Sequence, residues 1–129
     1  MTSELPIIDQ AVLDELRDSV GGDQAFVADL ASTYLSEGDG HIQQVEDALA
    51  RGDIAAMVRP AHTLKSSSAA LGAARLSAIS KEIEHAARDE QTDGLDTAVA
   101  DARAAWNETG RAEWPSPRFV FTTSAPLRT

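Results

Sequence analysis

The chain has 129 residues, which is enough for one domain with a hydrophobic core and too few for two. Its 21 acidic and 11 basic residues give a formal net charge of −10, which disfavours binding to nucleic acid or to an anionic membrane surface. The lack of cysteine excludes disulfides and thiolate metal sites, and no stretch resembles a signal peptide or a membrane span. We therefore expect a soluble cytoplasmic protein with a single functional site.

Composition and periodicity predict an all-α fold. Alanine is abundant, β-branched and aromatic residues are sparse, and no stretch alternates apolar and polar residues as a half-buried strand would. In chain order we expect a short helix between Asp9 and Gly21, one long helix over 23–51, and helices over 53–71, 74–89 and 94–109. Gly38 and Gly40 are candidate points for a bend in the long helix, and Gly72 and Gly110 are expected to end two of the later helices.

The short connections between these helices imply that neighbours run antiparallel. The expected architecture is an antiparallel up-down four-helix bundle with a short N-terminal capping helix, formed by residues 1–110. Residues 111–129 contain three of the five prolines and no helical period, so we predict an irregular C-terminal tail. Within this tail, the apolar stretch RFVF at 118–121 could lie back on the bundle or mediate a contact.

Charge is unevenly distributed along the chain. Residues 1–53 carry 12 acids and two arginines, and residues 82–129 carry nine acids and five arginines. Residues 54–81 between them carry four cations and no acid. Both lysines of the chain and His62 lie in this positive segment, which draws attention to the helix predicted over 53–71.

A helical wheel places His62 outside the core. At ~100° per residue, His62 lies roughly 140° from the centre of the buried stripe and Lys65 roughly 80° from it, the stripe being formed by Met57, Ala61, Leu64, Ser68 and Leu71. The outward neighbours of His62 are small or basic, whereas a solvated helix face usually carries Glu and Lys. This face leaves an exposed imidazole with clearance for another protein, although a plain surface histidine on an alanine-rich helix has the same pattern.

His62 and Lys65 together are suited to phosphoryl chemistry. A histidine side chain is mostly neutral near pH 7, so one ring nitrogen is free to act as a nucleophile. A lysine three residues further along lies on a neighbouring part of the helix surface, about 5–6 Å away between Cβ atoms, and its ammonium group suits a phosphoryl group. Pro60, by contrast, lacks a backbone N–H and predicts either a kink or a regular helix that starts only there.

The segment AHTLKSSSAALGA at 61–73 resembles the signature of the histidine-containing phosphotransfer (HPt) family, which typically reads His-x-Leu-Lys-Gly-Ser-Ser-x-x-Leu-Gly-Ala. The segments GGDQAFVADLASTYL, ALARGD and KEIEHAAR are also similar to family segments in order and spacing, so the likeness covers roughly residues 5–105. Ser66 departs from the signature, because glycine is usual at the position that leaves room for a docking domain. Serine is small enough that we expect this change to be tolerated.

The resemblance implies specific roles for site residues. His62 would take a phosphoryl group on Nε2, Lys65 would lie close to it, and Glu84 on the next helix would accept a hydrogen bond from Nδ1. The alternative for Glu84 is a solvated helix charge. The partner would contact the small-residue face around His62 and apolar residues near the helix starts, with the candidate contacts being Arg59, Ser66, Ser67, Ala69 and Gly72.

The function implied is that of a phosphoryl carrier in a multistep His-Asp phosphorelay of two-component signal transduction, and not that of an enzyme. The carrier would accept phosphate from a receiver-domain aspartate on His62 and pass it to another receiver. Implied partners are response-regulator receiver domains or a hybrid histidine kinase. We expect no cofactor and no metal on this chain, and Mg²⁺ on the partner receiver domain.

Two alternatives stay open. The chain could be a transfer-inactive module that only binds receivers, or a fragment of a histidine kinase. Kinase phosphoacceptor boxes normally have an acidic residue after the histidine, where this chain has Thr63, and 129 residues leave no room for a nucleotide-binding domain. The initiating methionine and the irregular tail favour a stand-alone protein.

Overall fold

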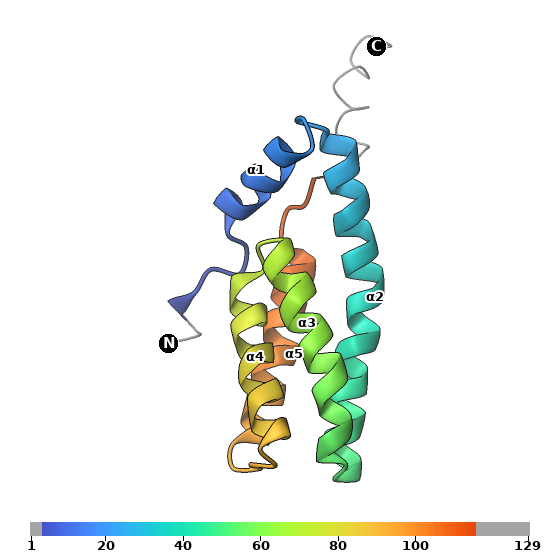
Figure 1. Cartoon of the computed structure of the whole chain (residues 1–129), viewed down its shortest axis with the longest axis vertical. Helices are drawn as coiled ribbons and strands as arrows, with labels where there is room; N and C mark the ends of the chain where they lie inside the picture. Colours follow the sequence, from blue (N-terminus) through green and yellow to red (C-terminus); the bar gives the residue numbers. More distant parts are fainter. Residues whose placement is uncertain (1–3, 116–129) are drawn as a thin grey trace.

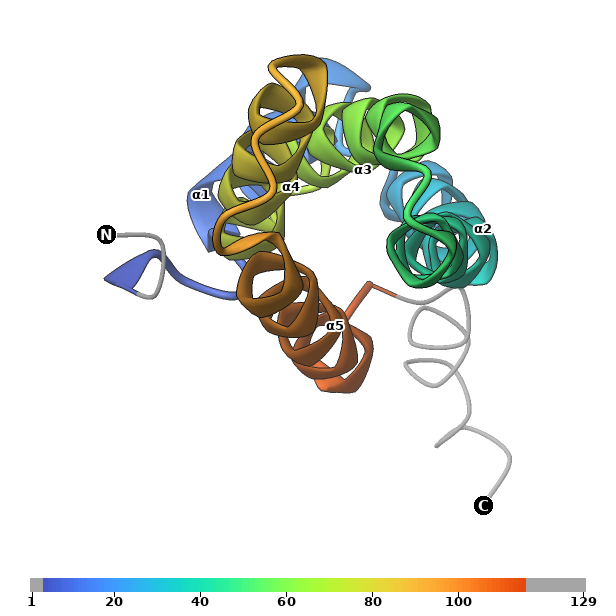
Figure 2. The same ribbon diagram turned by 90° about the horizontal axis from the view of Figure 1, so that it is seen from below.

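The computed structural model describes residues 4–115. Within this range, the chain forms five α-helices and one short 3-10 helix, η2, and no strand. The elements are α1 (Gln10–Ser19), α2 (Gln24–Arg51), η2 (Ile54–Met57), α3 (Val58–Ala70), α4 (Ala74–Arg88) and α5 (Leu95–Arg111). Helices α2 to α5 form an antiparallel bundle and α1 lies across one end of it (Figures 1 and 2), which confirms the predicted fold class.

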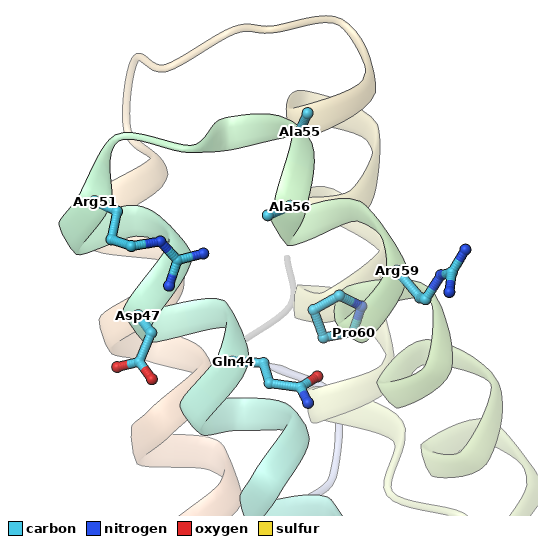
Figure 3. Close-up of a pocket in the computed structure, with 7 residues that line it drawn as sticks. All are labelled: Gln44, Asp47, Arg51, Ala55, Ala56, Arg59 and Pro60. Atoms are coloured by element: carbon cyan, nitrogen blue, oxygen red, sulfur yellow. The ribbon is translucent and has the colours of Figure 1, made fainter.

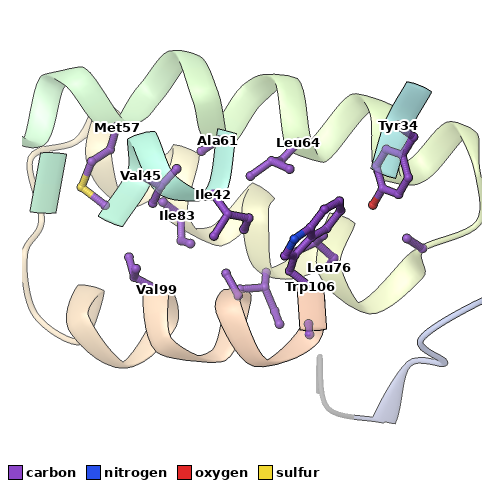
Figure 4. Packing of buried hydrophobic residues seen from close by; sticks show 14 of the residues in the cluster. Tyr34, Ile42, Val45, Met57, Ala61, Leu64, Leu76, Ile83, Val99 and Trp106 are labelled. Carbon is purple, nitrogen blue, oxygen red and sulfur yellow. The ribbon is translucent and has the colours of Figure 1, made fainter. Parts of the chain in front are cut away.

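The hydrophobic core runs along the axis of the bundle, between α2, α3, α4 and α5 (Figure 4). All members of the predicted stripe on the third helix are buried: Met57, Ala61, Leu64, Ser68 and Leu71. The one polar member, Ser68, is satisfied because its hydroxyl forms a 2.7 Å hydrogen bond with the hydroxyl of Tyr34 on α2. The core therefore fixes which face of α3 points outward.

Helix α2 continues without interruption through Gly38 and Gly40, the two candidate points for a bend. Gly38 is buried, and a Cβ atom added there would lie 2.7 Å from Cζ3 of Trp106, so the glycine allows the α5 tryptophan to pack directly against the α2 backbone. A Cβ atom at Gly40 would meet nothing within 4 Å. Gly38 is thus a packing residue and not a hinge.

The helix predicted over 53–71 is divided into η2 and α3. Asp53 caps the first part, because its side chain accepts a hydrogen bond from Ala56 N, and α3 starts at Val58. Pro60 is the third residue of α3, where a backbone N–H has no partner within the helix, so α3 starts two residues before the proline and not at it. The last helix also differs from expectation, since α5 continues through Gly110 to Arg111.

The connection between α3 and α4 is tied to the start of α1. Gly72 has a φ of +81°, which favours glycine, and its carbonyl accepts a 2.6 Å hydrogen bond from Asp9 N. Arg75 donates its backbone N–H to Pro6 O and its Nε to Leu5 O. These bonds place α1 over the end of the bundle, where Leu13 is buried.

Residues after α5 return to the bundle. Trp114 packs against Tyr34 with ring centroids 5.9 Å apart, and its Nε1 donates a 2.8 Å hydrogen bond to Thr109 O. The stretch 118–121 lies outside the described residues, and the division at residue 110 stays a prediction. No helix in the described part of the chain is long and apolar enough to cross a membrane.

Candidate functional site

His62 lies on the outward face of α3 and its side chain is 54% exposed, as the helical wheel predicts. Its Nδ1 atom is 2.9 Å from Oε2 of Glu84 on α4. Because an ionised carboxylate can only accept, Nδ1 carries the hydrogen, and in the neutral ring Nε2 keeps its lone pair. Nε2 is on the opposite side of the ring from Nδ1, so the nucleophilic nitrogen points away from Glu84.

Glu84 is held by two cations as well as by His62. Its side chain is only 3% exposed, and Lys65 Nζ lies 2.8 Å from Oε1. Arg88 donates to Oε2 through Nη2 at 2.7 Å and Nε at 3.1 Å. Burial raises the pKa of Glu84, but the hydrogen bonds from Lys65, Arg88 and His62 outweigh it and lower the pKa to about 2. Glu84 is therefore ionised at neutral pH although it is buried.

The pairing of α3 with α4 brings these groups together. The two helices run antiparallel after the short turn at Gly72, so residues well separated in sequence lie side by side (Figure 1). The hydroxyl of Ser77 on α4 donates a 2.9 Å hydrogen bond to the carbonyl of Lys65 on α3. This bond and the Glu84 contacts fix the register of the two helices around His62.

The other predicted contact residues are divided between the surface and the interior. Arg59, Ser66 and Ala69 are exposed on the same helix as His62, and Ser67 is half-buried with its hydroxyl donating to Thr63 O. Gly72 is the exception, because it is buried against the start of α1. The structure assigns Gly72 to the turn that joins α3, α4 and α1, and not to an accessible face.

Two features of the site differ from what the residues alone predict. Glu84 is buried, so its interpretation as a solvated helix charge is wrong, and the resemblance placed it correctly next to His62. Arg88 was not among the predicted site residues. Its spacing of four residues from Glu84 on one helix is the signal that could have identified it.

A groove of about 430 Å³ lies at the start of α3, and His62 is not among the residues that line it. It lies between the end of α2 and the start of α3 (Figure 3), and its lining residues are Gln44, Asp47, Arg51, Ala55, Ala56, Arg59 and Pro60. His62 itself stands on an open surface. Such a surface suits a phosphoryl donor that is itself a macromolecule and not a small molecule held in a cleft.

Within the described residues, no group of three or more His, Asp or Glu side chains is arranged to hold a metal ion. Glu84, which contacts His62, and its two partners Lys65 and Arg88 together carry one net positive charge. The site therefore combines an oriented imidazole with a local excess of positive charge.

Comparison with known proteins agrees with this geometry. A family model described as the Hpt domain matches residues 29–111. The crystal structure of histidine-containing phosphotransfer protein B (HptB) from Pseudomonas aeruginosa PAO1 is similar in fold, with a TM-score of 0.73 and 23% sequence identity over 81% of this chain and 89% of that one. No curated protein matches the chain in sequence. Since the family model covers more than half of the chain, the chain belongs to the Hpt-domain family, whose members are histidine phosphotransfer carriers of phosphorelay signalling.

Proposed function

We propose that His62 Nε2 is the atom that carries the phosphoryl group, received from the aspartyl phosphate of one receiver domain and passed to another. The observation that carries this proposal is the 2.9 Å hydrogen bond from Nδ1 to a buried, ionised Glu84. That bond leaves Nε2 of the neutral ring unprotonated and directed away from Glu84. An exposed imidazole without such a partner would be free to adopt either tautomer and several orientations.

In the proposed step, the Nε2 lone pair forms a bond to phosphorus while the bond between phosphorus and the aspartyl oxygen breaks. The electron pair of the broken bond stays on the aspartate, which leaves as a carboxylate. The imidazole becomes positively charged, because Nδ1 keeps its hydrogen. The Glu84 carboxylate accepts that hydrogen bond and stabilises the charge as it develops.

Lys65 and Arg88 support this step in two ways. Both keep Glu84 ionised and fixed in position, since together they contact both of its oxygens. Their excess positive charge also favours the approach of the phosphoryl group to this part of a strongly acidic protein. Lys65, which is partly exposed, is the nearer in sequence to His62 and is the candidate to contact the transferred group.

The receiver domain is proposed to supply Mg²⁺ and most of the stabilisation of the transition state, because phosphoryl transfer depends mainly on positioning and charge neutralisation. Carriers of this family are generally not catalysts, and we propose that this chain does not phosphorylate itself from ATP. The partners are then receiver domains, alone or in a hybrid kinase, and the compartment is the cytoplasm. The docking surface is the exposed face around His62, with Arg59, Ser66 and Ala69, together with apolar residues near the helix starts.

The experiment is incubation with a phosphorylated receiver domain, followed by a test for label that is labile in acid and stable in base. Wild-type protein and the matched control His85→Gln are expected to take up label, and His62→Gln is not. His85 is a suitable control because it is an exposed histidine on α4. Receiver binding without any label would instead identify a transfer-inactive module, and label from ATP alone would identify a kinase fragment.

A further inference from the structure

Helix α2 carries an apolar stripe that the described residues cover only at one end. Phe26, Leu30 and Tyr34 are spaced four residues apart, so they lie in one row along the helix. Tyr34 is buried and packs against Trp114, whereas Phe26 is 45% exposed and Leu30 is 37% exposed. Leu5 is the one other large apolar residue of the described chain that is exposed to this degree.

Trp114 brings the C-terminal part of the chain to this row. Figures 1 and 2 both show the segment after α5 crossing from α5 towards α2, and the contact between Trp114 and Tyr34 fixes where it arrives. Leu30 and Phe26 lie about 6 and 12 Å beyond Tyr34 along the helix axis. Phe119 and Phe121 are four and six residues beyond Pro115. In an extended chain they can therefore lie up to about 13 and 20 Å from Pro115. The reach of the chain therefore matches the length of the uncovered row.

The charges around the row are complementary to those of the segment 116–129. Asp23, Asp29 and Glu37 are exposed on both sides of Phe26 and Leu30, and none of the three forms an ion pair with a described cation. The segment 116–129 contains two arginines and no acid, and Arg118 directly precedes the apolar residues. The apolar row with its acidic borders is thus complementary in composition to the basic and apolar segment 116–129.

We propose that residues 118–121 bind the uncovered part of this row as a continuation of the Trp114 contact. Alternate residues of an extended strand point to the same side, so Phe119 and Phe121 both contact Phe26 and Leu30. Arg118 then lies close to the acidic border of the row. This contact goes beyond the proposed carrier function, because it requires no receiver and no phosphate.

The contact has a consequence that rests on the proposed function. Receivers are proposed to dock on the face around His62 and on apolar residues near the helix starts, and Phe26 and Leu30 lie in the first two turns of α2. A bound C-terminal segment therefore competes with the receiver for this surface. Transfer to His62 is expected to be slower in the intact chain than in a chain whose segment cannot bind.

The test of the contact uses a spin label on the intact chain. The sequence has no cysteine, so Thr123→Cys provides a single attachment site next to the proposed contact. In an NMR spectrum, amides of α2 near Phe26 and Leu30 are expected to lose intensity, and amides near Val45 at the other end of α2 are not. Adding Phe119→Ser and Phe121→Ser is expected to restore the lost intensity. Equal, weak losses at both ends of α2 would overturn the proposal.

Two controls separate the other occupants of this row. In the first control, ¹⁵N-enriched protein without a spin label is mixed with spin-labelled protein that is not ¹⁵N-enriched. The proposal predicts no loss of amide intensity in this mixture. A loss would show that the row binds a second copy of the chain instead. Transfer from a phosphorylated receiver is expected to be faster in the chain with Phe119→Ser and Phe121→Ser. Equal rates would contradict the competition with the receiver. If neither the intact chain nor the Phe119→Ser and Phe121→Ser chain takes up phosphate from the receiver, the proposed carrier function is overturned. The NMR experiment still decides whether the contact exists.

Discussion

The most informative perturbation of the site is the removal of the Glu84 carboxylate. Glu84→Ala deletes the acceptor of the His62 Nδ1 hydrogen bond and leaves Lys65 and Arg88 without their shared counter-ion. Glu84→Gln keeps an oxygen that can accept from Nδ1 but removes the negative charge. Glu82→Ala is the matched control, because Glu82 is an exposed glutamate on the same helix.

The size of the effect follows from the contacts of Glu84. A hydrogen bond to a charged group contributes about 1.5–3 kcal/mol, against about 0.5–1.5 kcal/mol for a neutral one. If the charged bond stabilises the imidazole as it becomes positive, Glu84→Ala slows transfer to His62 by roughly 10- to 150-fold. Glu84→Gln retains the neutral bond, so its loss is about tenfold.

The assay is the single-turnover rate of label transfer from a phosphorylated receiver, measured at several receiver concentrations. The maximal rate is expected to fall in the order wild type, Glu84→Gln, Glu84→Ala, while the receiver concentration at half-maximal rate stays constant because Glu84 is buried. Glu82→Ala is expected to transfer at the wild-type rate. A folded Glu84→Ala protein that also transfers at the wild-type rate would refute the role assigned to this carboxylate.

Three further predictions concern the folded state. The pKa of Glu84 is about 2 in the folded protein and its ordinary value is 4.5, so the ionised carboxylate stabilises the fold above pH 4.5. This contribution to the free energy of unfolding is expected to be lost as the pH falls from 4.5 to 2. Urea denaturation is expected to show the loss in wild type and not in Glu84→Gln. Gly38→Ala is expected to destabilise the fold by about 1–3 kcal/mol, because the added Cβ atom clashes with Trp106. Gly40→Ala has open space around it and is expected to stabilise α2 by up to about 1 kcal/mol. A lower melting temperature for both variants would contradict this prediction. Burial raises the pKa of Tyr34, the single tyrosine, to about 12, so an ultraviolet titration of the folded protein with a midpoint near 10 would show that Tyr34 is not buried.

The parts of the fold that depend on local chemistry could be predicted from the sequence. Aspartate is a favoured N-cap residue, and Asp9, Asp23 and Asp53 each accept a hydrogen bond from a backbone N–H of the helix that follows. The outward position of His62 follows from the spacing of apolar residues on its own helix. The resemblance to the HPt signature added the pairing with Glu84, which no pattern within one helix contains.

What could not be predicted depends on contacts between helices. Glu84 is buried because α3 covers it, and its charge is compatible with burial only because Lys65 and Arg88 converge on it from two helices. The role of Gly38 depends likewise on Trp106, whose ring occupies the space that a side chain at Gly38 would fill. Such contacts depend on the register between elements, and helical periodicity does not encode this register.

The central claim is that Nε2 of His62 carries the phosphoryl group while Nδ1 stays bonded to Glu84. The most direct measurement is ¹⁵N NMR of histidine side chains after phosphorylation by a receiver domain. We expect one phosphohistidine, at His62, phosphorylated on Nε2 with Nδ1 still protonated, and we expect it to disappear when a second receiver is added. Phosphate on Nδ1, or on His41 or His85, would contradict this assignment.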